Sequence, residues 1–271
     1  MSSPTEFSTS SAPASKRKIK IRLLAHGCKD IGDRTVQQDA FMISDKSLRK
    51  ERGLLAVLAD GMGGMESGEV FSNLAVNEMQ RYFSKCDPEE DICSVLLNAY
   101  QAARNEALKI PNSENGGSTV TAVLIRGKRC AFLSVGDSRI YLLRGGSLIQ
   151  LNREHTLGVR LDESAALGYV PAEEALYNLY RASLTNHLCM SSDIPCDRCT
   201  EPFLLRKDDK LLLMSDGIFG TLSEEDITRF ANMPGTDGAD AMIKEIRSRG
   251  KKDQDNCSVV ILALEPTNTV S

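Results

Sequence analysis

The chain has 271 residues, 41% of them hydrophobic and 26% charged, which is enough apolar material for one large domain or two small ones. Its 33 basic and 37 acidic side chains give a formal charge of −4, which argues against a nucleic-acid partner because such proteins usually carry a basic excess. No apolar run reaches the roughly 18 residues that a membrane-spanning helix needs, so we expect no membrane partner.

The N-terminal residues 1–18 are rich in Ser, Thr, Pro and Ala and end in three basic residues. A secretion signal places its basic residues before an apolar stretch, so this order predicts a disordered tail instead. Without a signal, the eight scattered cysteines are interpreted as reduced thiols of a cytoplasmic protein. Cys196 and Cys199 form a CxxC pair, which suits half of a zinc site or a redox pair, but no second clear CxxC accompanies it, and we favour ordinary thiols.

The first predicted elements are strands at 19–28, 39–43 and 54–59. The third, LLAVLA, is a short continuous apolar run, which is typical of a strand buried on both faces. It ends at Asp60, and the glycine-rich residues 61–64 predict a tight turn whose backbone carbonyls can approach a bound ion.

Two helices are predicted next. Apolar residues recur with a 3.6-residue period over 70–83 and over 92–107, which indicates an antiparallel helix pair on one sheet, joined through Asp87-Pro88. Four successive strands follow, at 118–125, 129–135, 140–143 and 147–151. The Gly145-Gly146 pair predicts a hairpin turn between the last two. A run of strands after two helices indicates antiparallel sheet and not βαβ units.

The next segment, 153–206, shows poor periodicity, and a segment of that length without regular structure is usually functional or mobile. A strand over 210–215 and a closing strand over 257–264 are predicted beyond it. Between them lie a helix capped by Ser223 and a second helix over 239–249. Because no internal repeat or clear linker is visible, we predict one domain over residues 19–271.

Several aspartates share one position, at the edge of an apolar strand; they are Asp39, Asp60, Asp216 and Asp255. Asp137 is a fifth, in the turn between two strands. If the strands belong to packed sheets, their ends can converge, and the carboxylates then repel one another unless cations neutralise them. The sequence places no cluster of Lys or Arg beside them. An all-oxygen site for Mg(II) or Mn(II) is therefore predicted.

Each of these residues also has an ordinary interpretation. A single Asp-Gly pair is most often a turn, and Arg34 alone would be a solvated surface arginine. Five aspartates placed in the same way favour a metal site over five unrelated turns. Two divalent ions suit phosphoryl chemistry, and Arg34, five residues before Asp39, has the planar guanidinium that matches a phosphate.

As a set, these motifs resemble the metal-dependent protein serine/threonine phosphatases of the 2C type, and their bacterial members in particular. They lie in the family's order: GDRTVQQDA (32–40), ADGMGGMESGE (59–69), GGSTVTAVLI (116–125), VGDSRIYLLRGG (135–146), LLMSDGIFG (212–220) and DQDNCSVVIL (253–262). The resemblance implies an α+β fold, a four-layer αββα sandwich of two antiparallel sheets flanked by helix pairs. It also implies that residues 153–206 form a flap bordering the active site.

The same resemblance implies the metal ligands, which are Asp39, Asp60, Gly61 through its carbonyl, Asp137, Asp216 and Asp255. Asp60 would bridge two Mn(II) or Mg(II) ions, one of them also bound by Gly61. Asp216 and Asp255 would complete the second site. Asp39 would support the cluster directly or through water, and Asp137 would contribute to a third, weaker site. Arg34 would bind the phosphate.

The chain departs from the family pattern in a few places. Gln37-Gln38 stands where Asn-Glu or Asn-Gln is usual, which lowers the expected affinity of the second metal site. Met62 replaces a histidine proposed as the general acid of animal members, so metal-bound water or another group must protonate the leaving oxygen. Residues 186–189 are less apolar than is usual in the flap. For His26, His155 and His187 we expect core or surface roles.

The sequence therefore predicts metal-dependent hydrolysis of phosphoserine and phosphothreonine in proteins by a metal-bridging hydroxide, without a phospho-enzyme intermediate. We expect a signalling enzyme that is monomeric and acts on the phosphoproteins of a serine/threonine kinase. Two alternatives stay open, a pseudophosphatase that serves as a binding module and a phosphatase of small phosphate metabolites. Turnover of a phosphothreonine peptide with excess Mn(II) tests the first alternative, and a comparison of phosphopeptides with sugar phosphates tests the second.

Overall fold

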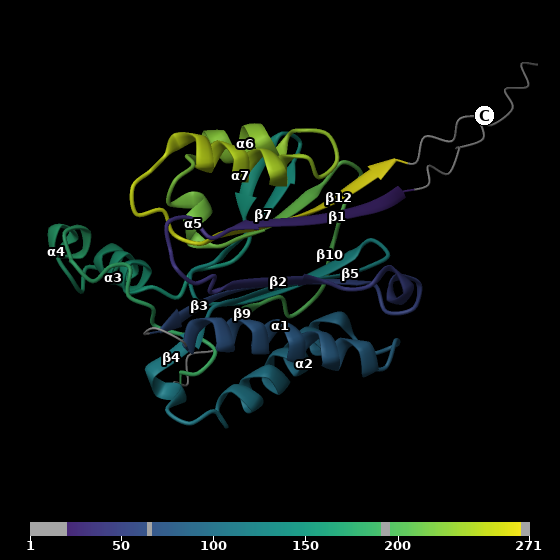
Figure 1. Cartoon of the computed structure of the whole chain (residues 1–271), viewed down its shortest axis with the longest axis horizontal. Coiled ribbons are helices and arrows are strands. Elements are labelled where there is room, and N and C mark those ends of the chain that lie inside the picture. The colour runs from purple at the N-terminus through teal and green to yellow at the C-terminus, as the bar shows by residue number, and fades with distance from the viewer. Residues whose placement is uncertain (1–20, 64–66, 191–195, 267–271) are drawn as a thin grey trace, which may run out of the picture.

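Two antiparallel sheets packed face to face form the centre of the protein in a computed structural model that describes residues 21–63, 67–190 and 196–266 (Figure 1). The β1 sheet has the order β1 (Ile21–Asp30), β12 (Cys257–Pro266), β11 (Lys210–Met214), β7 (Arg139–Arg144) and β8 (Ser147–Gln150). The β3 sheet has the order β10 (Phe203–Leu204), β6 (Arg129–Val135), β5 (Val120–Arg126), β3 (Leu54–Gly63) and β2 (Asp39–Ile43), with β4 (Gly116–Ser118) paired to β3 and β9 (Asp197–Arg198) to β6. The predicted tail, residues 1–18, lies outside the described residues.

Helices cover the outer faces of both sheets, so the predicted four-layer sandwich is confirmed (Figure 1). The β3 sheet is covered by α1 (Ser67–Lys85) and α2 (Ile92–Ala107), and the β1 sheet by α5 (Asp216–Phe219), α6 (Glu224–Ala231) and α7 (Gly238–Arg249). Two 3-10 helices, Lys46–Lys50 and Ser113–Asn115, occupy connections. None of the helices in the described residues is both long and apolar enough to cross a bilayer.

Strand β3 is buried on both faces over residues 54–59, as the apolar sequence of this run predicted. Successive side chains of a strand point to opposite faces. Leu54, Ala56 and Leu58 therefore pack between the two sheets, whereas Leu55, Val57 and Ala59 pack against α1 and α2. All six are fully buried. Because both faces of β3 are fixed in this way, the residues at its far end have little freedom to move.

The segment 153–206, for which the sequence indicated no regular structure, contains elements of its own. These are α3 (Leu157–Ala166), α4 (Ala172–Leu176) and the short edge strands β9 and β10. The two helices extend from the end of the sandwich at which β4 lies (Figure 1). Gly158 is the buried residue of α3 and Ala175 that of α4. The apolar side chains of α3, such as Leu157 and Leu161, are only half-buried, and α4 has five residues, too few for a periodic pattern to indicate a helix.

Candidate active site

Asp39 and Asp60 lie opposite each other on the neighbouring strands β2 and β3. Asp60 is followed by extended backbone and not by the predicted tight turn, because β3 continues to Gly63 by changing its partner. It pairs with β5 as far as Leu58 and with β4 from Gly61 onward. At the change of partner, the Thr119 N–H donates to the Asp60 carbonyl at 2.8 Å, and the Asp60 N–H donates to the Thr119 hydroxyl at 2.9 Å.

The glycine at position 61 serves a close approach and not a turn. A Cβ there would lie 2.0 Å from the carbonyl oxygen of Gly68 in α1 and 2.7 Å from that of Gln38. Both contacts are with backbone, which cannot move aside as a flexible side chain can. Glycine therefore allows α1 and the residues before β2 to close around the end of β3 that carries Asp60.

Asp216 and Asp255 reach the same edge from the β1 sheet. Asp216 begins α5, two residues after β11 ends, and Asp255 lies two residues before β12 begins. β11 and β12 are antiparallel neighbours, so the end of one lies beside the beginning of the other. Asp137 lies in the connection from β6 of the β3 sheet to β7 of the β1 sheet. Carboxylates from both sheets thus meet at one edge of the sandwich.

These side chains surround one cavity of about 510 Å³. Its wall contains Arg34, Asp60, Gly61, Asp137, Asp216 and Asp255. The Arg34 Nη2 donates to Asp255 Oδ2 at 2.8 Å. Gln38, Met62 and Asn256 also line the cavity. In the sequence, Gln38 and Met62 stood out only as departures from the family pattern, and Asn256 was not predicted.

Asp39 is the one predicted ligand that lies behind this wall, and only 1% of it is exposed. Its Oδ2 accepts a hydrogen bond of 2.7 Å from the Ser215 hydroxyl, which in turn accepts the N–H of Ser258 at 2.9 Å. Its Oδ1 is buried and has no hydrogen-bond partner among the described residues. A buried carboxylate oxygen without a partner is costly, and a cation is the kind of group that removes this cost.

The carboxylates oppose one another's ionisation. Burial raises the pKa of Asp39 to about 6 and that of Asp137 to about 7, and in both the nearby Asp216 carboxylate adds to the rise. Burial and then the Asp39 carboxylate raise the pKa of Asp60 well above its ordinary value. The pKa of Asp216 rises through burial and through Asp255. Positive charge in the cavity would allow all of these groups to ionise at neutral pH.

The donor set therefore fits hard divalent cations. Carboxylate oxygens and a backbone carbonyl at Gly61 are the ligands that Mg(II) and Mn(II) prefer. The described residues that line the cavity include no thiol, and their one imidazole, His187, lies on the wall beside Gly117. The unpartnered Oδ1 of Asp39 is the second sign that the residues fit such ions.

His187 is a cavity residue that sequence reasoning missed, since we expected it in the core or on the surface. A Cβ on Gly117 of β4 would lie 2.4 Å from its Nδ1, so the imidazole packs directly on that glycine. Nδ1 is buried without a hydrogen-bond partner in the described part of the chain, and burial lowers the pKa of the imidazole. The Leu188 N–H donates to the Ser118 carbonyl at 2.9 Å and fixes the neighbouring backbone. The polar character of 186–189 was the available signal.

The sequence matches the family model described as "Protein phosphatase 2C" over residues 26–249. The Mycobacterium tuberculosis serine/threonine protein phosphatase PstP is 32% identical over 212 residues, which are 76% of this chain and 40% of PstP, so the chain spans less than half of that relative. Among solved structures, a Streptococcus agalactiae serine/threonine phosphatase is 26% identical with a TM-score of 0.75, covering 89% of this chain and 99% of the other. A PstP catalytic domain in complex with two manganese ions is 29% identical with a TM-score of 0.68, covering 91% and 100%.

We expect the protein in EDTA to become less stable as the pH rises from about 4 to 7.5. A carboxyl group whose pKa is raised on folding, from an ordinary value of about 3.9, holds its proton more tightly in the folded state. The stability that it contributes is complete below pH 4 and is lost as the pH passes the folded-state value, about 6 for Asp39 and about 7 for Asp137. Melting temperatures measured in EDTA across this range test the prediction.

Two comparisons serve as controls for this pH dependence. The Asp137→Asn variant should show a shallower loss between pH 5 and 7.5, because one of the raised groups no longer titrates. Saturating MnCl₂ should stabilise the wild type more at pH 7.5 than at pH 5, since protons and cations compete for the same carboxylates. Equal slopes for wild type and variant would contradict this assignment of the pKa shifts.

Proposed function

The chain belongs to the protein phosphatase 2C family, and on this basis we propose that it hydrolyses phosphoserine and phosphothreonine in proteins with Mn(II) or Mg(II) as cofactor. The observation that carries the proposal is that Asp60, Asp137, Asp216, Asp255 and Arg34 line one cavity. Relatives named as serine/threonine phosphatases, and a PstP catalytic domain with two bound manganese ions, support it. The substrates would be products of serine/threonine kinases.

In this proposal each carboxylate has a separate task in holding cations. Asp60, at the end of β3 where Thr119 fixes its backbone, would hold both ions. Asp216 and Asp255 would hold the second ion from the β1 sheet. Asp39 would support the cluster from behind, and Asp137 would contribute to a third site. When bound, such ions would lower the pKa of a water nucleophile and neutralise the phosphate oxygens.

Arg34 binds and orients the phosphate. Asp255 holds its guanidinium at the cavity wall, and the hydrogen bond between them raises the pKa of Arg34, so the group stays charged. The Arg34 side chain is 58% exposed, which leaves further N–H donors for a phosphate. A carboxylate has about four lone-pair positions, so Asp255 can bind a cation while it keeps this hydrogen bond.

His187 donates a hydrogen bond to the leaving serine or threonine oxygen. Met62, on the same wall, has no proton to give. Burial keeps the imidazole of His187 neutral at pH 7, and a neutral imidazole still carries one N–H. The contact with Gly117 fixes the position of the ring.

Residues 167–180, which lie just before the cavity residues 182 and 184 in the sequence, favour a protein substrate over a small metabolite. Its large apolar side chains are exposed by 60–93%; they are Leu167, Tyr169, Leu176, Tyr177, Leu179 and Tyr180. The chain then continues to Ala182 and Leu184, which line the cavity. A patch of this kind beside a site usually contacts another protein, and a small metabolite in the cavity would leave it uncovered.

Metal dependence gives the first test. EDTA should abolish hydrolysis of p-nitrophenyl phosphate, and MnCl₂ should restore it. Asp60→Asn and Asp216→Asn should each lower kcat by about 100-fold or more, because each removes charge stabilisation from the transition state. Asp87→Asn, at an exposed aspartate of the α1–α2 connection, should retain activity. Full activity in both folded site variants, checked by circular dichroism, would overturn the assignment.

A leaving-group comparison tests His187. His187→Gln should lower kcat on a phosphothreonine peptide by about tenfold or more, since the hydrogen bond from the neutral imidazole stabilises the negative charge that develops on the leaving serine or threonine oxygen. The variant should hydrolyse p-nitrophenyl phosphate at nearly the wild-type rate, because p-nitrophenolate leaves without a proton. An equal loss on both substrates would show that His187 acts on the fold of the cavity and not on the leaving group.

Substrate size tests the exposed apolar segment. Replacing Leu179 and Tyr180 by serine should raise KM for phosphorylated casein about fivefold, which corresponds to roughly 1 kcal/mol of lost apolar contact. The KM for p-nitrophenyl phosphate and for sugar phosphates should stay unchanged. Ile149→Ser, at an exposed residue of β8, serves as the control. Unchanged KM values for casein would favour small phosphate metabolites as substrates.

A further inference from the structure

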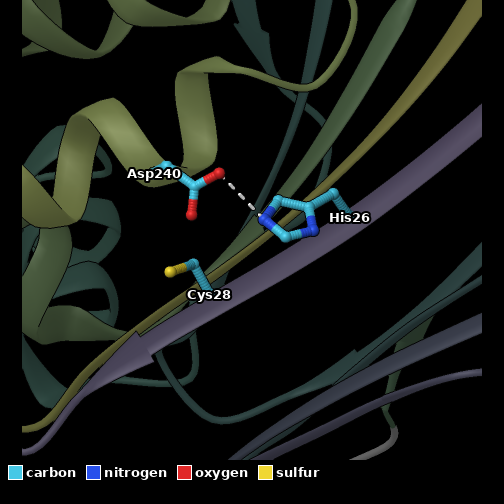
Figure 2. Close-up of side chains that lie close together, drawn as sticks. All are labelled: His26, Cys28 and Asp240. Atoms are coloured by element: carbon cyan, nitrogen blue, oxygen red, sulfur yellow. Dashed lines mark ion pairs between the residues drawn. The ribbon is translucent and has the colours of Figure 1, made fainter.

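His26, Cys28 and Asp240 form a compact group of possible metal ligands outside the catalytic cavity (Figure 2). A ring nitrogen, the thiol sulfur and a carboxylate oxygen of these residues all lie within 4.8 Å of one another. The His26 Nε2 and Asp240 Oδ2 are 3.0 Å apart. Among the described residues, no other group of three or more histidine, cysteine, aspartate or glutamate side chains has its possible ligand atoms this close together.

The topology explains why three such different side chains meet. His26 and Cys28 are two residues apart on β1 and therefore share one face of the strand. Figure 2 shows both side chains directed from β1 toward α7, where Asp240 lies in the first turn. Farther along, α7 packs on the β1 sheet through buried apolar residues such as Ile243 and Ile246. The polar group thus lies beside the apolar packing at the beginning of the helix, where Ala239 is buried.

We propose that this group is a binding site for Zn(II) or a similar borderline transition-metal ion, held by His26 Nε2, Cys28 Sγ and the Asp240 carboxylate with water as the fourth ligand. Nitrogen, thiolate and carboxylate donors are those that zinc uses in proteins. Mg(II) and Mn(II) prefer oxygen alone, so the site differs in chemistry from the carboxylate cavity.

The spacing and accessibility suit such an ion. Bonds of about 2.0–2.3 Å in a tetrahedral site place ligand atoms about 3.3–3.8 Å apart. The three ligand atoms lie within 4.8 Å of one another, so side-chain shifts of about 1 Å would bring them to these distances. The side chains of His26 and Asp240 are 43% and 66% exposed. The His26 Nε2 atom itself is buried, so an ion would enter past the exposed Asp240 carboxylate, where water can occupy the remaining position.

The surrounding charges are also compatible with a cation. Hydrogen bonds from His26 and Cys28 lower the pKa of Asp240, so the carboxylate is ionised. Arg247 of α7 also faces Cys28, but its guanidinium forms an ion pair with Asp30 of β1. Burial and Asp240 raise the pKa of the Cys28 thiol. The metal must displace the thiol proton, so binding releases a proton and strengthens as the pH rises.

The experiment uses Co(II) alone as a spectroscopic probe of the full-length, reduced protein after EDTA treatment and buffer exchange. A Co(II)–thiolate bond gives an intense near-ultraviolet charge-transfer band that oxygen ligands do not give, so ions in the carboxylate cavity do not contribute to it. We expect this band to level off at the intensity of one Co(II)–thiolate bond per chain, with visible bands of tetrahedral geometry, once any Co(II) taken up by the carboxylate cavity has been supplied. Excess Zn(II) should remove both.

Variants assign the band to the three ligands. Cys28→Ser should lose it, and His26→Gln and Asp240→Asn should shift half-saturation to about tenfold higher Co(II) or more. The Cys196→Ser/Cys199→Ser and Asp60→Asn variants should keep the wild-type intensity of the band at saturation, which separates the site from the CxxC pair and from the proposed function. Absence of the band in the wild type, or its survival in Cys28→Ser, would overturn the proposal. Asp240 is exposed, so its variant remains informative if Cys28→Ser fails to fold.

Discussion

The repulsion among carboxylates at one edge of the sandwich is the constraint on which the rest of the site depends. Asp39 and Asp60 face each other across neighbouring strands, and Asp216 and Asp255 approach from the other sheet. Hydrogen bonds from Ser215 and Arg34 satisfy part of this negative charge, but the buried Oδ1 of Asp39 has no partner in the described chain. Carboxylates packed this closely carry uncompensated negative charge at neutral pH, and cations in the cavity would stabilise them. The stability of the fold is therefore expected to depend on the cofactor.

The apolar core makes this arrangement rigid. Strand β3 is packed on both faces, and its continuation past Asp60 is paired with β4, so the carboxylate cannot withdraw from its neighbours. The Asp60 N–H donates a hydrogen bond to the Thr119 hydroxyl, and the Thr119 N–H donates one to the Asp60 carbonyl. The free energy gained by burying apolar side chains on both faces of β3 thus holds the carboxylates together, although their mutual repulsion favours separation. Such preorganisation is what a cation site needs, because the ligands need not be gathered when the ion binds.

Residues that follow strong local patterns could be predicted from the sequence, and residues placed by tertiary contact could not. The run at 54–59 and the aspartates at strand ends follow a pattern that only a buried strand explains. The glycines after Asp60 misled because a glycine permits a close approach as well as a turn, and Gly61 serves the approach to Gly68. Helices α3 and α4 are short and at most half-buried outside Gly158 and Ala175, so the pattern that they leave in the sequence is weak. His187 reaches the cavity only through its contact with Gly117, which no spacing along the chain reveals.

The two faces of the β1 sheet then separate two kinds of ligand chemistry. At the sandwich edge, between the sheets, the described residues that line the cavity offer oxygen donors, with His187 as their one imidazole and no thiol. On the outer face, beneath α7, a nitrogen and a sulfur donor meet one carboxylate. A hard ion gains little from a thiol, and a thiolate-seeking ion gains little from oxygens alone, so each site disfavours the ion of the other. β1 carries His26 and Cys28 and leads within a few residues to Arg34, so an ion fixed beneath α7 would brace the strand that leads to Arg34, the proposed phosphate ligand.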